Sequence, residues 1–256
     1  VIIPDGPLNA LPFAALNNAD GKYLVEQYVL SYAPGLSALM EMEKLRSTRA
    51  KNQKRVPWLG LARSQFAELG LKPLPGAEAE VAAIAPIFGK SAVVAHDASA
   101  TKSMARRELP RSRFIHMATH GLLNEAAPLY SSVALSPDKE DPDGRLYARD
   151  LMEMNLQADL VVLSACETAL GQEVRGEGVL GLTWALFVAG TPASIVTQWS
   201  VNDAATSVLM QNFYKQLQSG KTPDVALQTA QIALLKDRKM RHPSYWAPFI
   251  LVGAGG

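Results

Sequence analysis

Apolar residues follow two different patterns along the chain, and the change from one to the other falls near residue 56. Before it, short apolar runs at Val1–Ile3, Leu11–Phe13 and Tyr23–Tyr32 are separated by polar and glycine residues. This pattern predicts short antiparallel strands in the first 33 residues. Apolar residues at helical spacing from Leu36 to Leu45 then predict one helix.

From residue 56 onward, apolar runs typical of strands alternate with segments of helical spacing. Strands are predicted at Val56–Ala62, Ser91–Ala95, Phe114–His120, Leu160–Cys166, Ser194–Gln198 and Phe249–Val252. Helices are predicted at Ala77–Phe88, from Ser99 or Thr101 to Leu109, and at Val179–Ala189, Asp203–Gln218 and Thr222–Lys236. Nearly continuous apolar strands between helices favour a mostly parallel sheet covered on both faces, which is an α/β fold.

One domain over residues 1–256 is therefore expected. Residues 1–55 would supply the N-terminal strands, the helix and a basic loop, and residues 56–256 would form the core. Since the chain starts without Met and within an apparent strand, we expect a piece of a longer protein.

The segment Arg46–Arg55 carries five positive charges. A solvated loop is the expected reading, and removing its charge is then expected to leave the protein unchanged. Contact with nucleic acid is the alternative, although no aromatic residues are interleaved with the charges.

Composition narrows the function classes. Of the 256 residues, 48% are hydrophobic, and the formal net charge is +1, so no strong field favours nucleic acid or membrane partners. No apolar run reaches the roughly 18–20 residues needed to span a bilayer. The single cysteine excludes an internal disulfide and favours a reducing compartment, so a cytoplasmic location is expected.

That cysteine, Cys166, ends one apolar run, and His120 ends another 46 positions earlier. Parallel strands present their carboxyl ends at one edge of a sheet, so both side chains are expected there. A histidine can serve as the base that converts a thiol to the nucleophilic thiolate. The N–H groups of Gly121 and Cys166, in the turns at that edge, are candidates for an oxyanion hole. Taken singly, Cys166 fits a small buried hydrophobe and His120 a structural histidine equally well.

Other polar residues carry weaker signals. His116 and His120 would lie about 13 Å apart on a strand, too far to share a metal ion, so neither a metal site nor a cofactor is expected. Asp203 is either a helix N-cap or a pocket carboxylate. Glu167 receives no role as a base, because a carboxylate opposes ionisation of the neighbouring thiol. An acidic group without the calcium-loop pattern is expected to be a solvated turn: Asp138, Glu140, Asp141 and Asp143.

Longer motifs add a family resemblance. They are Ile3–Leu16 (IPDGPLNALPFAAL), Leu74–Glu80 (LPGAEAE), His116–Gly121 (HMATHG), Ala158–Gly171 (ADLVVLSACETALG), Gly176–Val179 (GEGV), Gln198–Asp203 (QWSVND), Phe213–Leu217 (FYKQL) and His242–Phe249 (HPSYWAPF). In this order they resemble the CHAT domain, a caspase-like module of the clan CD cysteine peptidases that is associated with tetratricopeptide repeats. The 46-residue His–Cys separation also fits caspases, although the caspase signature Q-A-C-[RQG]-G here reads S-A-C-E-T.

The resemblance implies a caspase–haemoglobinase fold, in which residues 56–256 form the catalytic core and His120 and Cys166 are the catalytic dyad of a cysteine endopeptidase. The stretch Trp199–Asp203 is similar to separase, which implies that Asp203 lines the S1 pocket and favours a basic P1 residue. Arg175 is a candidate self-cleavage site, with an exposed loop arginine as the alternative. Protein or peptide substrates and an upstream repeat or sensor domain are implied partners. A latent or inactive scaffolding module is the main alternative function, and a cysteine acyltransferase is a third.

Overall fold

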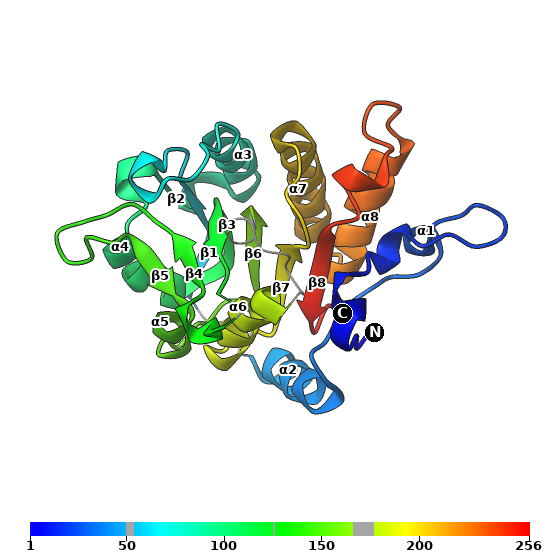
Figure 1. Cartoon of the computed structure of the whole chain (residues 1–256), viewed down its shortest axis with the longest axis horizontal. Helices are drawn as coiled ribbons and strands as arrows, with labels where there is room; N and C mark the ends of the chain where they lie inside the picture. Colours follow the sequence, from blue (N-terminus) through cyan, green and yellow to red (C-terminus); the bar gives the residue numbers. More distant parts are fainter. Residues whose placement is uncertain (50–53, 125, 166–176) are drawn as a thin grey trace.

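A computed structural model describes residues 1–49, 54–124, 126–165 and 177–256 (Figure 1). Within these residues, eight strands form one sheet: β1 (Val56–Ala62), β2 (Val93–His96), β3 (Ser112–Leu122), β4 (Ser132–Ala134), β5 (Arg145–Tyr147), β6 (Leu160–Ala165), β7 (Ala193–Thr197) and β8 (Phe249–Gly253). The helices are α1 (Leu24–Gln27), α2 (Leu36–Thr48), α3 (Ala77–Ile84), α4 (Lys102–Glu108), α5 (Ala148–Met152), α6 (Glu177–Val188), α7 (Asp203–Gln218) and α8 (Pro223–Lys236). None of these helices combines the length and the apolar character needed to cross a membrane.

The main sheet has the strand order β2-β1-β3-β6-β7-β8, and every neighbouring pair is parallel except β7 and β8. The α/β class predicted from the sequence is therefore confirmed. Two strands were not predicted: β4 and β5 form an antiparallel extension that pairs with the end of β3.

Helices cover both faces of the sheet, and alternate strand residues explain why (Figure 1). In β3, Ile115 and Met117 belong to one core, while Phe114 and Ala118 belong to the core on the opposite face. Residues of α4, α5 and α6 pack in the first core, and residues of α3, α7 and α8 in the second. Because both faces are covered, the strand sequences are apolar almost without interruption.

The first 33 residues differ from the prediction. Instead of antiparallel strands, they form 3-10 turns at Gly6–Ala10 and Phe13–Ala15, the single-turn helix α1, and isolated bridges. Tyr32 lies beside the edge strand β8, where its N–H donates to the Leu251 carbonyl at 2.7 Å. Tyr32 also accepts the Gly253 N–H at 2.8 Å, so this residue satisfies two backbone groups at the sheet edge.

The solvated-loop reading of the basic segment is wrong for two of its arginines. The side chains of Arg49 and Arg55 are only 8% and 7% exposed, and both pack against Asp159, just before β6. Arg55 pairs with Asp159 at 2.7 Å, and Arg49 donates to the Ala158 carbonyl at 2.9 Å. Arg49 and Arg55 thus link distant parts of the sequence, because their side chains donate hydrogen bonds to backbone carbonyls more than 100 positions away.

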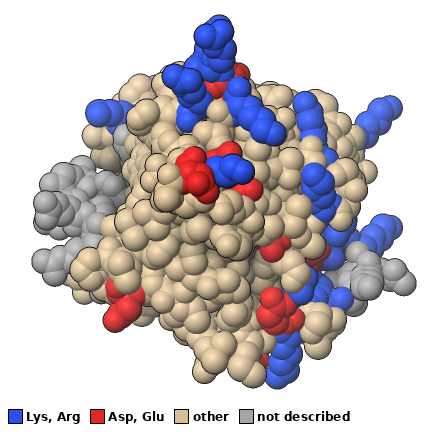
Figure 2. Space-filling view, turned by 90° about the vertical axis from the view of Figure 1, so that its right-hand side faces the viewer, with Lys and Arg blue, Asp and Glu red and all other residues tan. Residues whose placement is uncertain are grey.

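On the face drawn in Figure 2, Lys and Arg side chains lie along the top and the right-hand side with acidic side chains among them, and a small mixed group of acidic and basic side chains lies just above the middle. That face offers no broad basic surface of the kind that binds nucleic acid.

Replacing Arg55 with alanine is expected to lower the free energy of unfolding by about 1–2 kcal/mol, because it removes a largely buried donor from the part-buried Gln157 carbonyl and from the Asp159 carboxylate, which keeps its bond from Arg113. Urea denaturation followed by circular dichroism measures this change. The matched control is Arg46→Ala in the same segment, where an exposed pair with Glu43 is expected to contribute less than about 0.5 kcal/mol. Equal effects of the two substitutions would contradict the structural role of Arg55.

Candidate active site

His120 lies near the carboxyl end of β3, in register with the strand that leads to the cysteine. The register between β3 and β6 shifts between Met117 and His120, so that His120 lies opposite Ala165. Ala165 directly precedes Cys166, which lies outside the described residues, as do Glu167 and Arg175. The predicted strands thus bring His120 beside the end of the run that leads to Cys166.

The ring of His120 is fully buried and is oriented by a backbone carbonyl. Its Nε2 lies 2.7 Å from the Lys72 carbonyl oxygen, and Phe66 packs edge-on at 4.5 Å between ring centroids. Since a carbonyl can only accept, Nε2 carries the hydrogen, and in the neutral ring Nδ1 is the basic nitrogen. The Lys72 carbonyl therefore fixes the orientation of the His120 ring, a contact that the sequence did not reveal. A main-chain oxygen leaves no signal in residue identity.

Gly121 lies within β3, and not in a turn as predicted. The strand continues to Leu122, and Gly121 is opposite Val133 of β4. An oxyanion hole formed by the N–H groups of Gly121 and Cys166 stays a prediction.

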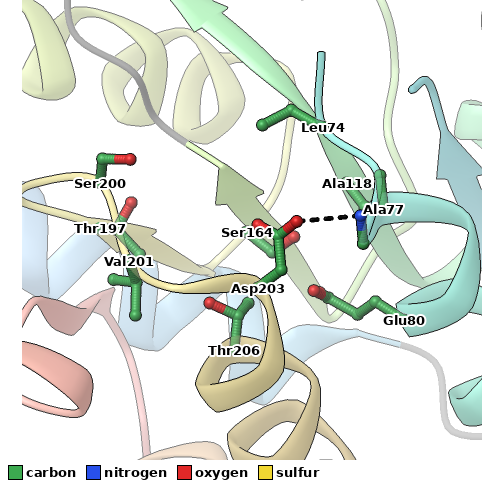
Figure 3. A pocket seen from close by; sticks show the side chains of 11 residues that line it. Leu74, Ala77, Glu80, Ala118, Ser164, Thr197, Ser200, Val201, Asp203 and Thr206 are labelled. Carbon is green, nitrogen blue, oxygen red and sulfur yellow. Dashed lines mark hydrogen bonds between the residues drawn. The ribbon is translucent and has the colours of Figure 1, made fainter. Parts of the chain in front are cut away.

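A pocket opens at the carboxyl ends of β3, β6 and β7 (Figure 3). It holds about 470 Å³ of space, part of it open to solvent. Its lining comes from three strand ends, the segment before α3 and the first turn of α7: Leu74, Gly76, Ala77, Glu80, Ala118, Ser164, Thr197, Ser200, Val201, Asp203 and Thr206. Ser164 is two residues before Cys166 in the sequence, so the pocket lies at the carboxyl end of β6, the strand that precedes the cysteine.

Asp203 lines this pocket and does not cap its helix. The side chain of Asn202 caps α7, because it accepts the N–H groups of Ala204 and Ala205. Asp203, the first residue of α7, instead accepts the Gly76 N–H at 2.9 Å (Figure 3). The N-cap alternative for Asp203 is therefore wrong, and its carboxylate is held at the pocket by a backbone donor from the segment before α3.

Gly76 permits this contact because it has no side chain. A Cβ at position 76 would lie 2.5 Å from the Asp203 Cβ, closer than packed carbon atoms come. We expect Gly76→Ala to displace the Asp203 carboxylate and to lower any activity that depends on it by about tenfold or more. The control is Gly35→Ala, where an added Cβ meets nothing within 4 Å. If Gly76→Ala retains full activity in a peptide-cleavage assay, the position of Asp203 is not important.

Below the pocket, a buried polar chain runs from α7 through β3 to α3. The Tyr214 hydroxyl lies 3.2 Å from His116 Nδ1, and His116 Nε2 lies 2.7 Å from Glu80 Oε1. Burial raises the pKa of Tyr214 well above its ordinary value, so its hydroxyl stays protonated and can donate. His116 thus belongs to a chain of hydrogen bonds on the α3 and α7 side of the sheet.

In the described ranges, no group of three His, Cys, Asp or Glu side chains is placed to hold a metal ion.

The acidic group at residues 138–143 is partly a buried anchor. Lys102, only 5% exposed, lies 3.0 Å from both Asp141 and Asp150. Burial alone would lower the pKa of Lys102, but the hydrogen bonds and charges of Asp150 and Asp141 outweigh it and raise that pKa. The solvated-turn reading is therefore wrong for Asp141, which helps to fix the segment between β4 and β5 against α4.

The fold and the strand-end pocket define a class of protein. The architecture resembles that of clan CD cysteine peptidases: gingipain R superposes with a TM-score of 0.57 at 9% identity, over 88% of this chain and 53% of that one. Separase of Saccharomyces cerevisiae, in its complex with securin, gives a TM-score of 0.61 at 11% identity, over 95% of this chain and 15% of that one.

Residues 1–254 match the CHAT domain, and the chain belongs to that family. Two relatives are tetratricopeptide repeat protein 28 of Mus musculus and of Homo sapiens, at 26% and 24% identity over 99% of this chain. The chain spans only 12% of the length of these relatives. The resemblance noted from the sequence motifs is thus confirmed at the level of the family and its caspase-like fold.

Proposed function

We propose that this chain is the peptidase domain of a cysteine endopeptidase with Cys166 as nucleophile and His120 as base. The observation that carries the proposal is the register of β3 and β6, which sets His120 opposite Ala165, beside a pocket that contains a carboxylate. The orientation of His120 by the Lys72 carbonyl supports it, since a base needs a fixed tautomer and ring position.

In the proposed reaction, His120 takes the thiol proton through Nδ1, and the Cys166 thiolate attacks the carbonyl carbon of the scissile peptide. Backbone N–H groups, with Gly121 and Cys166 as candidates, stabilise the oxyanion of the tetrahedral intermediate. His120 then returns its proton to the leaving amine, and the C–N bond breaks. Water, deprotonated by His120, hydrolyses the thioester and restores the thiol and the free carboxylic acid.

The carboxylate of Asp203 supports a preference for a basic residue at P1. It lies in the pocket at the end of β6 and makes no ion pair with a Lys or Arg among the described residues, so a substrate cation can pair with it. Gingipain R, which shares the fold, is described as an Arg-specific proteinase, and this also favours arginine at P1. Arg175 is retained as a candidate self-cleavage site on the same reasoning.

Regulation by an upstream repeat domain is part of the proposal. The relatives that align with this chain are tetratricopeptide repeat proteins, and the aligned part is a small share of each. Repeat arrays present extended binding surfaces, so a ligand bound there can be coupled to the peptidase domain.

Cleavage of a fluorogenic peptide library with varied P1 residues tests the proposal, with the Cys166→Ala variant measured in parallel. We expect turnover by the unaltered chain, greatest with Arg or Lys at P1, and its loss in the variant. Equal turnover in both proteins would contradict the role of Cys166. Absence of turnover in both would favour the alternative, a scaffolding module with a caspase-like fold.

A further inference from the structure

The pocket contains a second carboxylate, which the proposed peptidase mechanism does not use. Glu80, the fourth residue of α3, is only 4% exposed and lines the pocket together with Asp203. Figure 3 shows the two side chains extending from different helices toward the same space. A carboxylate at this depth has left most of its water, so its partners decide whether it keeps its charge.

Hydrogen bonding holds one of the two carboxylate oxygens of Glu80. His116 Nε2 donates to Oε1 of Glu80, since a carboxylate only accepts. The Tyr214 hydroxyl lies 3.2 Å from Nδ1 of His116, on the far side of the ring from Glu80. The other oxygen, Oε2, makes no hydrogen bond within the residues that the structure describes. Oε2 is not enclosed by protein atoms, and because Glu80 lines the pocket, a donor that enters the pocket, either water or a ligand, can bond to this oxygen.

The N-termini of α3 and α7 offset the unfavourable energy of placing the Glu80 and Asp203 carboxylates in one pocket. Glu80 lies at the end of the first turn of α3, and Asp203 is the first residue of α7. The N-termini of both helices carry partial positive charge, which stabilises nearby carboxylates. The pocket thus carries two negative groups on two rigid elements, together with the hydroxyl-bearing residues Ser164 and Thr206.

We propose that Glu80 is a second specificity-determining residue of this pocket, and that with Asp203 it selects an arginine side chain over a lysine side chain. The identification of that side chain as a substrate residue rests on the proposed peptidase function. A guanidinium group has five N–H donors in a planar fork and can bond to two carboxylates at once. A lysine ammonium is a compact charge that is satisfied by one carboxylate and water.

The first test compares cleavage of matched peptides with Arg or Lys at P1. Glu80→Gln keeps the shape and an acceptor for His116 but removes the charge, so the Arg/Lys ratio of kcat/KM is expected to fall about tenfold or more. Glu80→Asp keeps the charge on a shorter stem and should give an intermediate ratio. The matched control is Glu78→Gln in the same turn, outside the pocket lining, which should leave the ratio unchanged. An unchanged ratio in folded Glu80→Gln, with Arg still cleaved, would overturn the role of Glu80 and leave the peptidase proposal standing.

The second test does not depend on catalysis. Titration calorimetry measures binding of acetyl-Ala-Ala-Ala-Arg amide and its Lys counterpart to the Cys166→Ala variant. We expect tighter binding of the Arg peptide and an affinity loss of about tenfold or more on adding Glu80→Gln. Such binding without any cleavage by the unaltered chain would overturn the peptidase proposal and support the role of Glu80. If the Arg and Lys peptides bind equally, or neither binds, the assignment of Glu80 is wrong.

Discussion

Replacing His120 with alanine is expected to lower kcat/KM for peptide cleavage by about 10³-fold. The substitution removes the base that takes the Cys166 proton and the acid that protonates the leaving amine, and such proton transfers contribute about 10²- to 10⁴-fold. The backbone donors and the pocket remain, so the residual rate should exceed that of the uncatalysed reaction. Steady-state kinetics on the best library peptide measure the change.

A second histidine at the carboxyl edge of the sheet provides the control. His96 ends β2 and is exposed, and β1 lies between β2 and β3. His96→Ala is expected to retain normal kinetics. If His120→Ala, shown to be folded by circular dichroism, retains kcat/KM within a fewfold of the unaltered chain, His120 is not the base.

The second large effect is expected at Asp203. Asp203→Asn keeps the size of the side chain and an oxygen that can accept the Gly76 N–H, but it removes the charge that pairs with a basic P1 residue. We expect kcat/KM for an Arg peptide to fall about 30- to 100-fold, while peptides with an uncharged P1 residue change little. The measurement is a comparison of P1 profiles for the two proteins.

A control substitution at another aspartate in the first turn of a helix distinguishes an effect on substrate specificity from an effect on helix stability. Asp224 lies in the first turn of α8, where it accepts the Val225 N–H at 2.8 Å, and it does not line the pocket. Asp224→Asn should leave the P1 profile unchanged, although both substitutions remove a carboxylate from a helix N-terminus. A profile that Asp203→Asn does not alter would contradict the assignment of Asp203.

Much of the fold could be predicted because strands and helices of the core carry long, clear patterns. The strand Val56–Ala62 and the helix Asp203–Gln218 have the bounds predicted for them. In contrast, β4 and β5 contain three residues each, too few for periodicity to be visible. The apolar Tyr23–Tyr32 run was predicted as a strand, but it contains α1, and only Tyr32 bridges to β8. Its contacts depend on residues more than 200 positions away, such as Gln228, which donates to the Val25 carbonyl.

The candidate site was predictable only where its residues carry chemistry of their own. Cys166 and His120 are predicted as site residues because a thiol and an imidazole at two strand ends suggest a nucleophile and a base. The Lys72 carbonyl has no sequence signal, since every residue has one. Glu80 falls within the predicted helix Ala77–Phe88 and receives no role from the sequence, because its contact with His116 and its place in the pocket arise from tertiary packing. Arg49 and Arg55 were misread for the same reason: local charge density does not reveal a distant partner.

The central claim is that His120 activates the Cys166 thiol beside a pocket for a basic side chain, and covalent trapping tests it most directly. The probe is a peptidyl acyloxymethyl ketone with arginine at P1, and the readout is intact mass followed by peptide mapping. Because Cys166 is the only cysteine, a thioether adduct can form at one position. We predict one adduct per chain at Cys166, formed much more slowly in His120→Ala and faster than with an analogous probe bearing a neutral P1 residue. No adduct, or labelling at the same rate in His120→Ala, would contradict the claim.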